Sequence, residues 1–89
     1  MKLSKKTALE IRQALNTKDL HGIAARYKER GLTFTRFMWD AYHSIGHNNT
    51  CEIIARNNPD VEVIGGYLTN IKDSHIETML KVAFKDCKF

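Results

Sequence analysis

Apolar residues recur at helical spacing in the first half of the chain, and capping residues separate the runs. The third run shows this best, since its apolar positions share one helix face: Phe34, Phe37, Met38, Ala41 and Ile45. Thr33 precedes this run and Gly46 follows it, and these residue types begin and end helices. The same signals predict three helices, over residues 4–16, 17–30 and 33–45, capped by Ser4, Thr17 and Thr33.

Two further helices are predicted in the second half of the chain. Thr50 ends a polar turn, and it is a good N-cap for a short helix over Cys51–Asn57. Ser74 and Glu77 have the spacing of a capping box, and apolar residues at helical spacing follow them. We therefore expect a last helix that starts at Ser74.

The segment between these two helices carries competing signals. Asn58-Pro59-Asp60 has the order of cap, first-turn proline and acidic residue that favours a helix over Val61–Asn70. Against this, Val61–Ile64 is rich in strand-forming residues, and Gly65-Gly66 costs a helix about 1 kcal/mol per glycine. Because a lone strand has no evident pairing partner, we predict a helix over Val61–Asn70.

These elements predict an all-α fold, a compact bundle of five to six short helices in a single domain over residues 1–89. The sequence has no repeats, linkers or low-complexity segments, and its 43% hydrophobic content suffices for one core. No apolar run approaches the roughly 18 residues of a membrane span, and no signal-peptide pattern follows the N-terminus. With only two cysteines, expected as thiols, this predicts a cytoplasmic protein without membrane contact.

The positive charge is concentrated in the N-terminal half. The net charge is +4, and residues 1–40 hold nine basic and four acidic residues, against five and six in residues 41–89. This excess of basic residues in residues 1–40 favours binding to nucleic acid or to an acidic protein. Residues 18–45 resemble a helix-turn-helix, although Ala24 and Gly31 are farther apart than the tight motif allows. The candidate nucleic-acid contacts are Lys5, Lys6, Arg12, Lys18, Arg26, Lys28, Arg30 and Arg36.

The single tryptophan is predicted to lie beside the apolar face of its helix. On a helical wheel, Tyr42, Trp39, His43 and Arg36 follow one another around the side away from the apolar stripe. Trp, Tyr and Arg contribute most to protein–protein binding. We therefore predict a partner-binding face made of Arg36, Trp39, Tyr42 and His43. The alternative is that Trp39 packs under a neighbouring helix.

No pattern typical of an enzyme is present. The sequence lacks a phosphate-binding loop, a nucleophile elbow and an HExxH motif, and its histidines have no spacing that specifies an acid–base pair. His43, His47 and Cys51 have metal-ligand spacing, but Gly46 is expected to end the helix between them. No metal and no cofactor are therefore predicted. We expect a small basic, non-enzymatic protein that docks on a protein partner as an adaptor, regulator or inhibitor. Nucleic-acid binding is the alternative, and self-association stays open.

Overall fold

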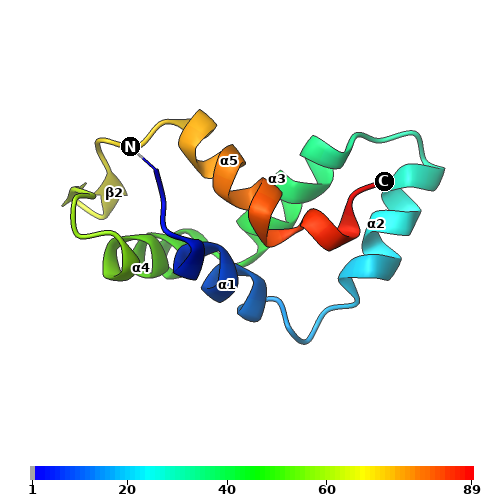
Figure 1. Ribbon diagram of the computed structural model, residues 1–89, viewed down its shortest axis with the longest axis horizontal. Helices are drawn as coiled ribbons and strands as arrows, with labels where there is room; N and C mark the ends of the chain where they lie inside the picture. The colour runs from blue at the N-terminus through cyan, green and yellow to red at the C-terminus, as the bar shows by residue number, and fades with distance from the viewer. Residues whose placement is uncertain (1) are drawn as a thin grey trace.

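The computed structural model describes residues 2–89, which form five α-helices, a β-hairpin and a short 3-10 helix (Figure 1). The elements are α1 (Lys5–Gln13), α2 (Leu20–Glu29), α3 (Phe34–Ser44), α4 (His47–Asn57), β1 (Val63–Ile64), β2 (Tyr67–Leu68), α5 (Asp73–Ala83) and η1 (Lys85–Cys87). The predicted all-α bundle of five to six short helices is confirmed. Within residues 2–89, no helix has the length and apolar character needed to cross a membrane.

The first and last helices of the chain form the centre of the molecule. α1 packs against α5 and α4, and α5 also packs against α3. α2 packs against α3 and η1 at one end of the long axis, and the hairpin lies at the other end (Figure 1). The overall dimensions are 39 × 24 × 22 Å. The core is built on large, fully buried side chains: Ile11, Leu15, Phe37, Met38, Ile54, Leu80 and Phe84. Each stabilises the fold by about 1.5–3 kcal/mol through burial.

Capping side chains set the starts of the first three helices. Ser4 and Thr33 accept hydrogen bonds from backbone N–H groups three residues further on, at 3.3 and 3.1 Å, as their positions in the sequence predict. The cap of α2 is Asp19 and not Thr17, because the chain makes further turns after α1 before α2 begins. The Asp19 carboxylate accepts from the Gly22 N–H at 3.1 Å, and its charge also suits the positive end of the helix dipole.

α4 and α5 both begin earlier than the sequence predicts. α4 starts at His47, because Gly46 adopts a φ of 99° and lets the chain turn from α3 into α4 at once. Thr50 therefore lies inside α4, where its hydroxyl donates a hydrogen bond to the His47 carbonyl at 2.9 Å. α5 starts one residue before Ser74. The His75 ring makes this possible, since it accepts a hydrogen bond at 3.1 Å from the backbone N–H of residue 72.

The helix predicted over Val61–Asn70 is wrong, because this segment folds as the β-hairpin. β1 and β2 pair antiparallel, with Ile64 opposite Tyr67. Gly65 and Gly66 have φ values of 61° and 81°, and a tight type I′ turn requires positive φ at both central residues. β2, which directly follows the glycine pair, is thus the pairing partner that was not evident from the sequence for a strand at Val61–Ile64.

Asn58 ends α4 instead of starting a new helix. Its buried amide group donates hydrogen bonds to the Ile54 carbonyl at 2.7 Å and to the Thr7 hydroxyl at 2.8 Å. Its side-chain oxygen accepts from the backbone N–H of Ser4 at 2.8 Å. These bonds join the end of α4 to the start of α1, and they explain why the cap-like sequence after α4 does not begin another helix.

Candidate functional site

Three of the four residues predicted to bind a partner form one aromatic cluster on α3. The Trp39 and Tyr42 rings meet edge to face with centroids 5.7 Å apart, and the His43 ring lies 5.8 Å from that of Trp39. Tyr42 is buried, Trp39 is half-buried against the core, and His43 is exposed. The cluster therefore belongs partly to the core and partly to the surface.

The fourth predicted residue, Arg36, pairs with an acidic residue of its own helix. Its guanidinium lies 3.8 Å from the Asp40 carboxylate, one turn along α3. The same carboxylate accepts a hydrogen bond from the Tyr27 hydroxyl on α2 at 2.6 Å. The Asp40 carboxylate thus connects α3 to α2, and Arg36 pairs with that carboxylate and not with the aromatic cluster.

Tyr42 and His43 line a groove of about 400 Å³ between the α3–α4 junction, the hairpin and the start of α5. The residues that define this groove are Tyr42, His43, Gly46, His47, Thr50, Cys51, Tyr67, Leu68, Ile71, Asp73 and Ile76. Its wall combines aromatic and imidazole rings with aliphatic side chains. Burial raises the pKa of the Tyr42 hydroxyl, so this group is neutral at physiological pH. Trp39 adjoins the groove through its contact with His43.

His47 holds the hairpin against the first turn of α4. Its Nε2 donates a hydrogen bond to the Gly66 carbonyl at 2.9 Å, and its ring lies 5.0 Å from the ring of Tyr67. Because a carbonyl oxygen only accepts, Nε2 carries the proton in this contact. The buried Cys51 thiol is directed at the same carbonyl, with a sulfur–oxygen distance of 3.7 Å. One turn of α4 therefore fixes the hairpin wall of the groove.

Large apolar side chains are exposed on the hairpin next to the groove. Ile64 and Tyr67 are each 66% exposed, and Val63 is 43% exposed. The strand register places Ile64 opposite Tyr67, so that they form one surface. Single exposed apolar residues are common, but a group of them beside a groove marks an interaction site. Because a helix was predicted over Val61–Asn70, these residues were not identified from the sequence as a candidate site. The signal that finds them is the Gly-Gly pair between two short runs of strand-forming residues.

The eight residues of the nucleic-acid alternative do not form one surface. α1, which carries Lys5, Lys6 and Arg12, lies apart from the C-terminal half of α2 along the long axis (Figure 1). Arg12 is occupied by the Asp86 carboxylate through two hydrogen bonds, of 2.6 and 3.0 Å. α2 and α3 do pack as a helical hairpin around Gly31, whose φ is 73°. What remains is a smaller basic group at the end of that hairpin: Arg26, Lys28 and Arg30.

The metal-ligand spacing of His43, His47 and Cys51 does not bring three donor atoms together in the part of the chain that the structure describes. The Cys51 sulfur lies 3.7 Å from Nε2 of His47, but Gly46 places His43 on the preceding helix.

The groove offers several kinds of chemical group to a binding partner: aromatic faces, imidazoles, a neutral phenol and the Asp73 carboxylate. These groups suit binding of a folded or extended protein segment. Comparison of the chain with protein-family models, with curated proteins and with solved structures finds no match.

Proposed function

We propose that this is a non-enzymatic docking protein of the cytoplasm, which binds a protein partner through the groove and the hairpin beside it. The observation that carries the proposal is the position of two exposed apolar side chains, Ile64 and Tyr67, next to the aromatic wall of the groove. Interfaces combine such exposed aromatic and aliphatic groups with a pocket that accepts a partner's side chain. Trp39, the tryptophan of the predicted face, supports this wall through His43.

The size of the groove suits one or two anchoring side chains of the partner. About 400 Å³ lies at the lower end of the range for small-molecule pockets. An inserted side chain would contact the rings of Tyr42 and His43, while Ile64 and Tyr67 would be covered by flanking residues. Covering these apolar groups supplies the favourable free energy, and a hydrogen bond from the His43 imidazole orients the inserted segment.

The partner is expected to carry acidic residues around its apolar anchor. The net charge of this protein is +4. Gly46, the N-cap residue of α4, has no side chain that could cap the helix, so the positive end of the α4 dipole opens at the groove. The exposed His43 ring can donate a hydrogen bond at the same place, whereas Asp73 repels an acid on the α5 side. The acidic residues of the partner should therefore lie toward α4.

Nucleic-acid binding is the alternative function. The observation that favours it is the basic group of Arg26, Lys28 and Arg30, which makes no ion pair among residues 2–89. On α3, however, the exposed Asp40 carboxylate stands beside Arg36 and would repel a phosphate backbone. The alternative thus rests on a small patch at one end of the molecule.

Selection of binders from a library of random displayed peptides tests the docking proposal before a partner is known. The selected peptides should share an aromatic or large aliphatic residue flanked by acids. The double variant Ile64→Ser/Tyr67→Ser should weaken their binding by about tenfold or more. Val82→Ser is the matched control, because Val82 is 47% exposed and lies on α5, away from the hairpin. This variant should bind the selected peptides as tightly as the wild-type protein does.

Two results would contradict the docking proposal. One is a set of selected peptides whose affinity is the same for the wild-type protein and the hairpin double variant. The other is tight binding to generic duplex DNA or RNA that weakens steeply as salt rises and is lost in Arg26→Glu/Arg30→Glu, which would establish the nucleic-acid alternative.

A further inference from the structure

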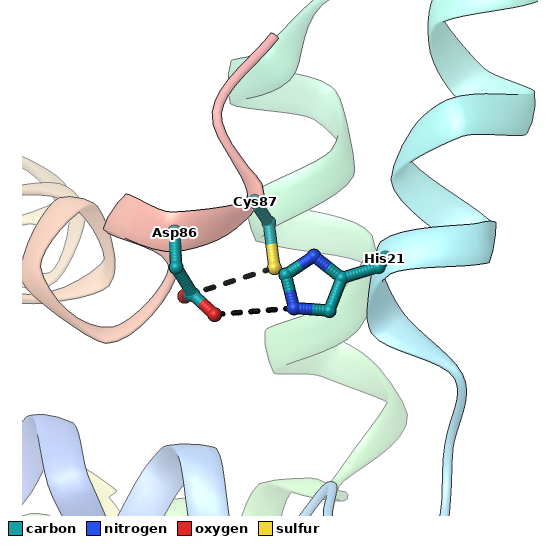
Figure 2. Close-up of side chains that lie close together, drawn as sticks. All are labelled: His21, Asp86 and Cys87. Carbon is teal, nitrogen blue, oxygen red and sulfur yellow. Dashed lines mark hydrogen bonds and ion pairs between the residues drawn. The ribbon is translucent and has the colours of Figure 1, made fainter.

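A second group of chemically reactive side chains lies where η1 packs against α2, away from the hairpin. Figure 2 shows the His21 ring from α2 and the Asp86 and Cys87 side chains from η1 directed toward one another. Nε2 of His21 is 3.2 Å from one Asp86 carboxylate oxygen, and the Cys87 sulfur is 3.9 Å from the other. One donor atom of each residue lies within 4.8 Å of the other two, an arrangement that no other such trio in residues 2–89 shares.

We propose that His21, Asp86 and Cys87 bind a Zn²⁺ ion, with water as the fourth ligand. Zinc prefers a tetrahedral set of nitrogen, sulfur and carboxylate-oxygen ligands, which these three side chains supply. At ordinary zinc–ligand distances, neighbouring donor atoms are about 3.3–3.8 Å apart, close to the separations on either side of the carboxylate. The His21 and Asp86 side chains are 64% and 50% exposed, so an ion reaches them directly from solvent.

Arg12 keeps the Asp86 carboxylate ionised and oriented. It donates hydrogen bonds of 2.6 and 3.0 Å to the two carboxylate oxygens, and these hold the pKa of Asp86 down to about 2. A carboxylate offers about four lone-pair positions, so the paired arginine leaves two of them for other contacts. One of these free positions on the Asp86 carboxylate faces Nε2 of His21. The zinc ion would replace the proton that lies between Asp86 and His21. The charge of Arg12 limits the affinity, because it opposes a second cation.

Zinc binding requires proton changes at the other two ligands. Cys87 coordinates as a thiolate, so its thiol releases one proton, and His21 presents the Nε2 lone pair while keeping its proton on Nδ1. Zinc and protons therefore compete for the same ligand atoms. Affinity should therefore fall as the pH is lowered.

Binding of the ion would cross-link η1 to α2 and stabilise the folded chain. The test is thermal unfolding of the full chain with EDTA or with added Zn²⁺, together with calorimetric titration. We expect one ion per chain and a melting temperature about 5–10 °C higher when free zinc is roughly tenfold above its dissociation constant. Co²⁺ in place of zinc should give the near-ultraviolet absorption band of a thiolate–cobalt bond.

His21→Ala and Cys87→Ser should each weaken zinc binding by more than about tenfold, and Cys87→Ser should abolish the cobalt–thiolate band. Cys51→Ser is the matched control, because Cys51 is the other buried thiol near a histidine. The Cys51→Ser protein should bind zinc as tightly as the wild-type protein does. Because His21 is exposed, the His21→Ala variant should keep its fold. If Cys87→Ser unfolds, zinc binding by His21→Ala therefore still tests the proposed site. Absence of zinc binding by the wild-type protein, unchanged affinity in His21→Ala, or loss of binding in Cys51→Ser would overturn the proposal.

Discussion

The buried side-chain amide of Asn58 donates a hydrogen bond of 2.8 Å to the buried hydroxyl of Thr7, which is 51 positions away in the sequence. The Thr7 hydroxyl also lies 2.9 Å from that of Ser4, whose backbone N–H donates to Asn58. This small polar network fastens the start of α1 to the end of α4. Across residues 2–89, no buried side-chain nitrogen or oxygen lacks a partner, so removing one member leaves others unpaired.

Replacing Asn58→Ala should lower the free energy of unfolding by about 2–4 kcal/mol, measured by urea denaturation. The expected loss exceeds that of one ordinary hydrogen bond, because the Thr7 hydroxyl and the Ile54 carbonyl both lose a buried partner. Asn48→Ala is the control: Asn48 is exposed on α4, and its replacement should change stability by less than about 0.5 kcal/mol. Equal effects of the two substitutions would show that the network contributes nothing.

Gly66→Val should unfold the hairpin while leaving the helices intact. Gly66 has a φ of 81°, a left-handed conformation that costs a β-branched residue about 1–2 kcal/mol or more. Hydrogen exchange followed by NMR should show loss of protection at Ile64 and Tyr67 and little change in α1 or α5. Gly65→Asn should be tolerated, since asparagine is common at the first central position of a type I′ turn. A Gly66→Val protein with a protected hairpin would refute this assignment of the turn.

Acid should remove the stabilising contribution of Glu10. The Asn57 amide, which donates to this carboxylate, and then Arg56 lower the pKa of Glu10 below its ordinary value of 4.5. A folded-state pKa below the unfolded one means that the contribution is complete above about pH 5 and disappears as the pH falls through the lowered value. Between pH 6 and pH 3, the wild-type protein should therefore lose more stability than Glu10→Gln. Parallel loss in both proteins would assign the acid sensitivity to other groups.

Trp39→Ala should reduce stability by an intermediate amount. The ring is half-buried against the core, so we expect a loss of roughly 1–3 kcal/mol, between the values for exposed and fully buried residues. Fluorescence of the wild-type protein should show emission blue-shifted from free indole and partial quenching by iodide. His43→Ala, on the exposed side of the same cluster, should leave stability nearly unchanged. Full quenching combined with a neutral Trp39→Ala would place the ring outside the core.

The helical part of the fold could be predicted because local signals and packing agree. In α3, the apolar spacing, the Thr33 cap and the terminal Gly46 all indicate the same helix, and the structure buries Phe37 and Met38 as this spacing requires. At Val61–Asn70, by contrast, cap-like residues and strand-forming residues disagreed. Asn58 does not cap a helix here because it bonds to the distant Thr7, and no local pattern reveals that contact, whereas the glycine pair of the hairpin turn is a local signal.

The site was predictable only in part, for a similar reason. Helical spacing placed Trp39 and His43 together, but it could not show that His43 and Tyr67 would line the same groove. His21 and Cys87 are far apart in the sequence, so their proximity depends wholly on the packing of η1 against α2. Sites built from distant residues require tertiary structure, whereas a stripe on one helix does not.

The packing of α1 against α5 has a consequence for how the chain folds during its synthesis. α1 is synthesised before α5, so the core that buries Ile11 and Leu80 is completed only when residues 73–83 have been made. Contacts between such distant segments carry a large loop-closure cost and form late. The apolar face of α1 therefore stays exposed to chaperones and to other nascent chains until α5 has been made. Fragments that stop before α5 should accordingly fail to fold, although most of their helices are already present in the sequence.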